Sequence, residues 1–222
     1  MLILFFSQPT FLSDIRRGLD ITFGSLHHEA YGGILIRSIA NRKTNEIIEG
    51  SCLVVETILK LCNSETIKEL IETRLNFNLN VFDPNSVVFL RQIDCDHEKT
   101  LVSSPRVGLT LKVPSIDRER FLFRPYRFTP DDYFPSKSKI TLSLALVAKK
   151  YFQQTNTKKK FVDFSSILPT RAKLRPANFN DLQNGFDADV SKKSSPLVNF
   201  HKKTFNTSDL AKAYGIWIRN YQ

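Results

Sequence analysis

The sequence lacks a long hydrophobic run and contains few cysteines. No window holds about 18 uncharged apolar residues, so we expect no helix that spans a membrane, and the apolar opening at residues 1–6 is too short for one. The three cysteines, Cys52, Cys62 and Cys95, are odd in number and include no CxxC pair. They provide no disulfide framework, which makes a reducing compartment the default expectation.

The common motifs of enzymes are also missing. The chain contains no GxGxxG, GxxxxGK[ST], GxSxG or HExxH pattern, which removes the usual signals for nucleotide binding, serine hydrolysis and zinc proteolysis. Residues 94–98 combine carboxylate, thiol and imidazole groups, but one contiguous stretch rarely closes a metal site. We expect a polar loop there, and no metal or cofactor. His27 and His28 are expected near a helix end, an ordinary place for histidine.

Apolar residues make up 41% of the 222 positions, enough to bury a core and to argue against wholesale disorder. The length suits one generous domain, or one domain with an appendage. Charge divides the chain. Residues 1–136 hold 16 basic and 17 acidic side chains, whereas residues 137–222 hold 16 basic and 5 acidic ones, a net charge of +11.

The first part of the chain reads as a folded α+β body, residues 1–136. Helices are predicted over residues 10–31 and 63–74, the second capped by Ser64. Strands are predicted where β-branched runs or alternating apolar residues lie between turn signals, at residues 34–39, 47–48, 52–55, 77–81, 87–93, 107–113 and 121–128.

The second part, residues 137–222, reads as a basic extension with little order of its own. Basic clusters alternate with short apolar patches, and prolines interrupt long helices. Residues 140–151 suit either a strand or a helix, and residues 208–221 suit a closing helix. Such a segment normally folds against a partner. Its apolar patches are therefore predicted to dock on neighbouring proteins, namely Phe161, Phe164, Ile167, Leu168, Leu197, Val198 and Phe200.

Several blocks resemble the alkyladenine (3-methyladenine) DNA glycosylase family. G-I-L-I-R at residues 33–37 and V-V-E-T at residues 54–57 are similar to the family's opening strands, G-x-L-L-V-R and I-V-E-T-E-A-Y. Further blocks follow in family order at residues 77–81, 88–93, 105–109 and 124–128. The resemblance covers about residues 20–128. It implies a small, curved, antiparallel sheet with a barrel-like form, and a family that removes alkylated purines from DNA.

The departures from this family argue against catalysis. The resemblance places the catalytic glutamate, which activates water, at Ile58, and an apolar side chain cannot accept a proton. Lys60 replaces a stacking tyrosine, and residues 70–75 contain no aromatic ring where the family has its pocket tyrosines. Base flipping needs such rings to offset the cost of unstacking. An active enzyme would need Glu46, Glu49 or Glu56 as a substitute base.

The candidate nucleic-acid contacts fall into three groups. Asn80 and Arg91 persist from the family's base pocket, either to grip a nucleotide or, as we favour, as structural hydrogen-bonding residues. Arg124 and Arg127 are interleaved with aromatic residues and could stack on bases or cover phosphates; the simpler alternative is a strand with a basic outer face and an aromatic core face. The third group is the extension's basic residues, Lys158, Lys159, Lys160, Arg171, Lys173, Arg175, Lys192, Lys193, Lys202 and Lys203.

These features together predict a non-catalytic protein of a ribonucleoprotein assembly, such as a mitochondrial ribosome, whose basic region contacts RNA phosphates. The first 13 residues contain no acid, which favours a mitochondrial location; the nucleus and cytoplasm are the alternatives. Two other functions remain open. One is a divergent glycosylase, and the other is a protein-interaction scaffold whose tail binds an acidic partner.

Overall fold

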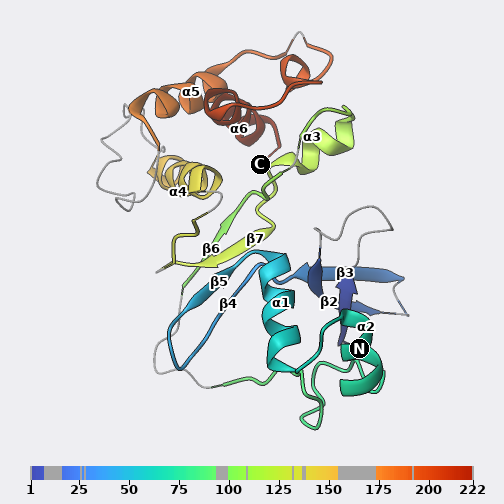
Figure 1. The fold of residues 1–222 in the computed structure, drawn as a ribbon. Coiled ribbons are helices and arrows are strands. Elements are labelled where there is room, and N and C mark those ends of the chain that lie inside the picture. Colours follow the sequence, from blue (N-terminus) through green and yellow to red (C-terminus); the bar gives the residue numbers. More distant parts are fainter. Residues whose placement is uncertain are drawn as a thin grey trace. The chain divides into compact units, whose positions relative to one another are not determined.

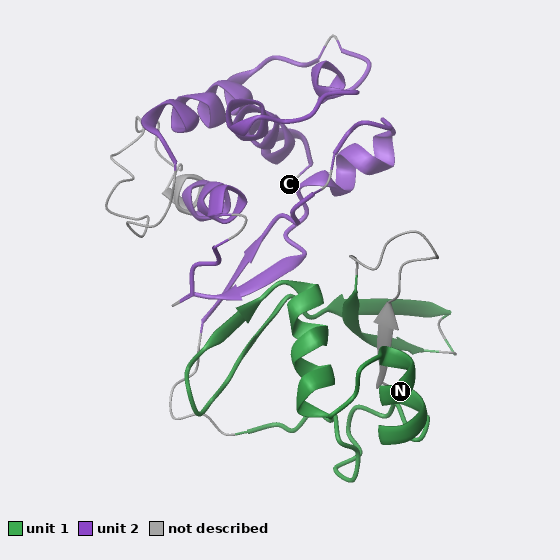
Figure 2. Cartoon of the chain, in the orientation of Figure 1, with its two compact units in different colours: residues 1–96 green, residues 97–222 purple. Residues whose placement is uncertain are grey.

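The computed structural model forms two compact units, Met1–Asp96 (unit 1) and His97–Gln222 (unit 2), shown in Figure 2. The division falls 40 residues before the expected boundary at residue 136. Residues from both sides of that boundary share the core of unit 2, which explains the difference. The structure describes residues 2–7, 17–25, 27, 29–93, 100–108, 110–131, 133–136, 139–154, 174–191 and 193–221.

Unit 1 begins with an antiparallel sheet of β1 (Leu2–Ser7), β2 (Gly18–Ser25) and β3 (Ala30–Leu35), in that order (Figure 1). The helix predicted over residues 10–31 is therefore wrong for residues 18–25 and 30–31, whereas residues 10–16, 26 and 28 lie outside the described residues. Two glycines of this sheet lie beneath aromatic rings. A Cβ on Gly24 would lie 2.7 Å from the ring of Tyr31, and one on Gly32 would lie 2.6 Å from the ring of Phe23. Each aromatic ring thus covers a glycine on the neighbouring strand.

A second pair, β4 (Ser38–Ala40) and β5 (Ile47–Glu49), leads into helix α1 (Ser51–Leu61). The strand predicted over residues 52–55 is therefore wrong. Gly50 separates the strand from the helix with φ of 118°, a conformation that glycine adopts without strain. Val55 and Leu59, four residues apart, lie on the buried face of the helix.

The helix predicted over residues 63–74 is confirmed from residue 67 onward, as α2 (Ile67–Glu69) and the π-helical turn η2 (Leu70–Arg74). Its cap is Thr66, whose hydroxyl accepts the backbone N–H of Glu69, rather than Ser64. This segment and α1 surround the core of unit 1, which consists of Leu19, Val55, Leu59, Ile67, Leu70, Leu75 and Val81.

The strands predicted over residues 77–81 and 87–93 are not formed. The backbone of Val81 accepts one hydrogen bond, from the N–H of Leu90 at 2.6 Å. The side chains of Asn78, Asn80 and Asp83 instead bind nearby backbone N–H groups. Short polar side chains compete in this way with the hydrogen bonds of strand pairing. The prediction from alternating apolar residues did not consider this competition.

Unit 2 contains a two-stranded antiparallel ribbon, β6 (Leu101–Ser104) and β7 (Arg127–Pro130), with α3 (Ile116–Leu122) between them in the sequence. The strand predicted over residues 107–113 is not formed by its described residues. The strand predicted over residues 121–128 is wrong as far as residue 126, because this stretch ends α3 and only then enters β7.

The rest of unit 2 is helical: α4 (Lys139–Gln154), α5 (Pro176–Asp187), the 3₁₀ turn η4 (Val198–Phe200) and α6 (Thr207–Tyr221). The closing helix over residues 208–221 is confirmed, and residues 140–151 are helical. An extension with little order of its own is contradicted by the described residues. Leu111 and Phe123 are buried with Leu144, Leu182 and the side chains of α6 in one core.

Helices α5 and α6 approach each other closely through two glycines. A Cβ on Gly185 would lie 2.0 Å from the carbonyl oxygen of Lys212, and one on Gly215 would lie 2.0 Å from that of Leu182. Only hydrogen fits at these positions, so the two helix backbones are in contact. Two glycines far apart in the sequence therefore act as one packing feature.

The fold is mixed α and β, with small antiparallel sheets. Within the described ranges the strands form three separate sheets, so the barrel-like closure expected from the glycosylase resemblance is not observed. No helix of the described chain is long and apolar enough to cross a membrane.

Candidate nucleic-acid interface

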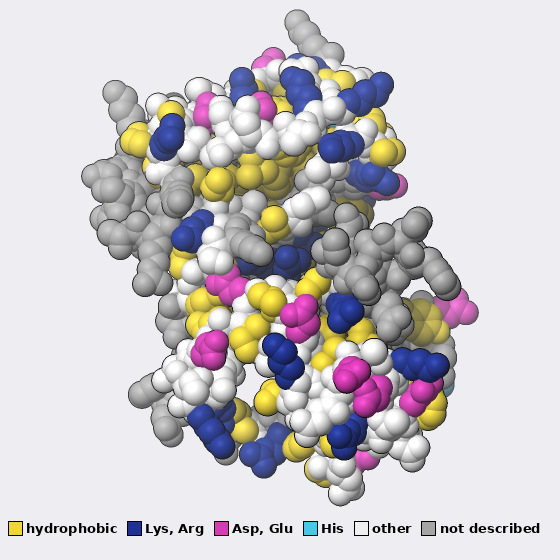
Figure 3. Space-filling view, in the orientation of Figure 1, with side chains coloured by type: hydrophobic (Ala, Val, Ile, Leu, Met, Phe, Trp, Pro, Cys, Tyr) yellow, Lys and Arg dark blue, Asp and Glu magenta, His cyan; other side chains and the backbone are white. Residues whose placement is uncertain are grey.

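The unit boundary sharpens the charge division. Unit 1 carries 9 basic and 12 acidic side chains, a net charge of −3, whereas unit 2 carries 23 and 10, a net charge of +13. Figure 3 shows the difference on one face: Lys and Arg predominate over α5 and α6, while both signs are interspersed over unit 1. A polyanion would therefore be attracted to unit 2.

One part of unit 2 combines arginines with exposed aromatic rings. Arg118 and Arg120 of α3 are exposed, and Arg124 and Arg127 are half-buried. Glu119, the single acidic residue in the stretch 118–128, is completely buried. This stretch, which we call the arginine–aromatic segment, therefore exposes arginines and no carboxylate of its own, and the exposed carboxylates nearest to it in the sequence are Asp117 and Asp131.

The simpler alternative for this segment was a strand whose aromatic side chains face the core, and most of its rings do not. Tyr126 is 57% exposed and Phe128 is 67% exposed. Thr129, on the other face of β7, is 5% exposed. Phe123 alone follows the expectation, because it packs on Tyr214 with ring centroids 5.1 Å apart. The segment thus presents its rings to solvent beside its arginines.

The other candidate contacts are divided between the two units. Asn80 is exposed and its side-chain oxygen accepts the N–H of Phe82 at 3.1 Å, which is a turn contact. Arg91 is exposed and belongs, like Asn80, to unit 1. In unit 2, Arg175 precedes α5, and its backbone N–H donates to the side chain of Asn178. Asn80 and Arg91 thus belong to one unit and Arg175 to the other.

The basic residues of the former extension are partly described. Lys193, Lys202 and Lys203 are exposed. Lys158, Lys159, Lys160, Arg171, Lys173 and Lys192 lie outside the described residues, as do Phe161, Phe164, Ile167 and Leu168. Leu197 and Phe200, predicted to dock on another protein, are instead buried in the core of unit 2. Their apolar surface is used by the chain itself.

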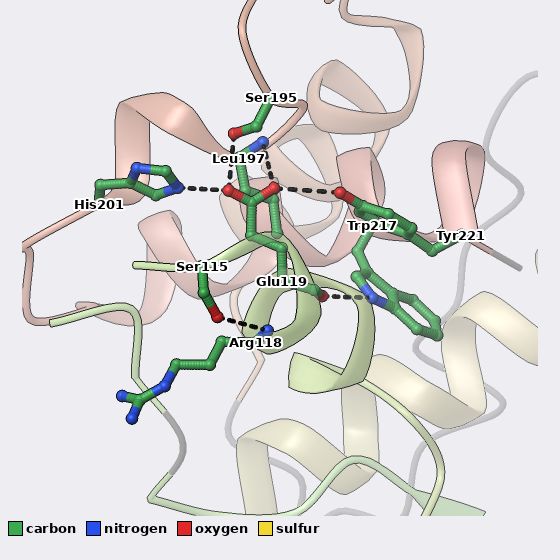
Figure 4. Close-up of polar contacts among 8 residues, drawn as sticks. All are labelled: Ser115, Arg118, Glu119, Ser195, Leu197, His201, Trp217 and Tyr221. Carbon is green, nitrogen blue, oxygen red and sulfur yellow. Dashed lines mark hydrogen bonds and ion pairs between the residues drawn. The ribbon is translucent and has the colours of Figure 1, made fainter. Parts of the chain in front are cut away.

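The carboxylate of Glu119 has several hydrogen-bond partners within unit 2. We call Glu119 and these partners the Glu119 cluster (Figure 4). The carboxylate accepts the hydroxyl of Ser195 at 2.6 Å, the hydroxyl of Tyr221 at 3.1 Å and the backbone N–H of Leu197 at 3.4 Å. His201 contacts the same carboxylate through Nε2. The helix that carries Glu119 begins at Ser115, whose hydroxyl accepts the N–H of Arg118.

Sequence reasoning missed this cluster because the side-chain partners of the Glu119 carboxylate lie 76–102 residues after it in the sequence. The indole N–H of Trp217 also donates to the backbone carbonyl of Glu119 at 3.0 Å. Burial, together with the hydrogen bond and the negative charge from Glu119, raises the pKa of Tyr221 to about 12. Both carboxylate oxygens are occupied and Glu119 is fully buried, so the cluster joins α3 to the C-terminal segment and offers no open reaction site.

The residue that the glycosylase resemblance would align with a catalytic glutamate is apolar. Ile58 lies on α1, partly buried against the core of unit 1. The proposed substitute bases are also in unit 1, where Glu46 and Glu56 are exposed and Glu49 is half-buried.

No three His, Cys, Asp or Glu side chains of the described residues are grouped to hold a metal ion. The whole mixed polar cluster at residues 94–98 lies outside the described residues. His27 is exposed in the segment between β2 and β3, and His28 lies outside the described residues.

The comparison with known proteins identifies a viral relative. The chain is similar to the uncharacterized protein L759 of Acanthamoeba polyphaga mimivirus, with 30% identity over 146 residues. The match covers 61% of this chain and 62% of the mimivirus protein, less than two thirds of its length. The chain matches no protein-family model and no solved structure.

Proposed function

We propose that this chain is a non-catalytic, RNA-associated component of a nucleoprotein assembly, and that unit 2 contacts the RNA. The observation that carries the proposal is the net charge of +13 on unit 2 against −3 on unit 1. Each phosphate that a Lys or Arg neutralises releases condensed counterions, which favours binding without requiring a sequence motif.

We propose a protein without catalytic activity because the residue to which the glycosylase resemblance assigns water activation is Ile58. A hydrocarbon side chain cannot polarise water or accept its proton. We expect no alkylpurine release above a no-protein control when the chain is incubated with methylated duplex DNA. Release well above that control would refute this part of the proposal.

The electrostatic part is tested with the full chain and a fluorescein-labelled RNA. Contacts with about 6–10 phosphates would weaken binding by about 10³–10⁵ between 50 and 200 mM salt. Lys202→Gln/Lys203→Gln removes two exposed charges from unit 2. This pair should lower the slope of log K against log salt by about 1.4 on a single strand, at about 0.7 per phosphate contact.

Unit 1 offers a matched control. Arg42→Gln/Lys43→Gln also removes two adjacent exposed charges from a turn, here between β4 and β5, and should leave the slope unchanged. An equal effect of both pairs would assign the binding surface to the whole chain. RNA binding that does not depend on salt would refute the proposal.

A further inference from the structure

We infer that the arginine–aromatic segment of unit 2 binds single-stranded RNA by stacking its exposed rings on unpaired bases. This inference rests on the proposed function and adds to it the form of RNA and the contact surface. Tyr126 and Phe128 are 57% and 67% exposed, two residues apart at the start of β7. Base–aromatic stacking tolerates any sequence because every base has a π-face.

The surroundings of the rings favour a nucleic acid as the occupant. Arg118 and Arg120 are exposed on α3, just before the rings in the sequence. Glu119 between them is fully buried, and its carboxylate is occupied by Ser195, Tyr221 and other partners. Arginine can pair with phosphate through its planar guanidinium group and can also stack on bases.

Single-stranded RNA suits these groups better than a duplex. In a duplex the base faces are stacked on each other, and the deep, narrow major groove of A-form RNA keeps side chains from the base edges. Folded RNA exposes unpaired bases in its loops and bulges. RNA is therefore the nucleic acid to which this surface is assigned.

The test measures the anisotropy of labelled oligouridine of about 12 nucleotides, a length within the usual single-strand site range, with the full chain. Tyr126→Leu and Phe128→Leu remove a ring but keep apolar bulk and charge. Each should weaken binding about 5- to 150-fold, without changing the salt slope, because no charge is lost. Phe128→Trp enlarges the ring and should retain or tighten binding.

Unit 1 provides the control variant. Phe82 is 58% exposed, and Phe82→Leu should leave the affinity for oligouridine unchanged. Binding to double-stranded RNA should be unaffected by Tyr126→Leu and by Phe128→Leu. Thermal unfolding of each variant checks that the fold is intact, as expected for exposed side chains.

The outcomes separate this inference from the proposed function. If the wild type binds RNA with a steep salt slope but Tyr126→Leu and Phe128→Leu bind oligouridine equally well, stacking is refuted and the proposed function stands. If the wild type does not bind RNA, both fail. An equal loss of duplex binding would refute base stacking, and tighter binding to oligothymidine than to oligouridine would refute the assignment to RNA.

Discussion

The sharpest test of the fold of unit 2 is the removal of the Glu119 carboxylate. In Glu119→Ala, the hydroxyl of Ser195 and the N–H of Leu197 lose their buried acceptor. Ser195 is 8% exposed and Leu197 is 0% exposed, so water has little access. Each buried group left without a partner costs about 1–3 kcal/mol.

Two other effects modify this sum. Tyr221 and His201 are half-buried, so water can replace part of their contact with Glu119. The variant also lacks the desolvation penalty of a buried carboxylate, and this offsets part of the lost free energy of unfolding. Two buried groups at about 1–3 kcal/mol each, less this offset, lead us to expect Glu119→Ala to lower the free energy of unfolding of unit 2 by about 2–5 kcal/mol.

Glu119→Gln separates charge from shape. The amide keeps one acceptor oxygen but presents an NH₂ group to several donors, so we expect a smaller loss of about 1–3 kcal/mol. Asp187→Ala is the control in the same unit, because Asp187 is exposed at the end of α5. Surface substitutions usually change the free energy of unfolding by about 0.5 kcal/mol or less.

The assay is urea unfolding followed by tryptophan emission. Trp217 is the one tryptophan of the chain, and it is 2% exposed in the core of unit 2, so its emission reports that unit. The reasoning would be refuted by a Glu119→Ala variant that loses less than about 1 kcal/mol, the net value of one ordinary hydrogen bond.

Three further predictions concern other parts of the chain. Gly215→Ala would place its Cβ 2.0 Å from the carbonyl oxygen of Leu182, so we expect a loss of about 1–3 kcal/mol in the same urea assay. Tyr221 has a pKa raised to about 12 by burial and by Glu119, so its stabilisation should be full below about pH 10 and be lost as the pH rises towards 12; Tyr221→Phe should remove a late step from the tyrosinate absorbance titration and flatten this loss of stability. Thr66→Ala removes the N-cap of α2 and should cost unit 1 about 0.5–2 kcal/mol, measured by circular dichroism.

The unit boundary also changes how the chain should be divided. A cut at residue 136 would separate Leu111 and Phe123 from the helices that bury them. It would also separate Glu119 from Ser195, His201 and Tyr221. We expect a fragment of residues 1–136 to expose these groups and to aggregate, so experiments on charge are better done with point variants of the full chain.

Sequence reasoning succeeded where local signals decide the structure. The closing helix at residues 208–221 and most of the helix at 63–74 were predicted, because periodic apolar residues and capping residues act within one or two turns. It failed at β2 and β3, where glycines are covered by rings on the neighbouring strand. It also failed at α1, because a short apolar run suits a strand or a buried helix equally.

The sequence by itself determined the charge division, since net charge is a property of composition and position. Only the tertiary structure decided that residues 97–136 belong with the helices that follow, and that Tyr126 and Phe128 are exposed while Leu197 and Phe200 are buried. The physical reason is that burial and the Glu119 cluster depend on contacts between residues up to 102 positions apart. No local pattern specifies such contacts, because each partner is an ordinary residue until the chain brings them together.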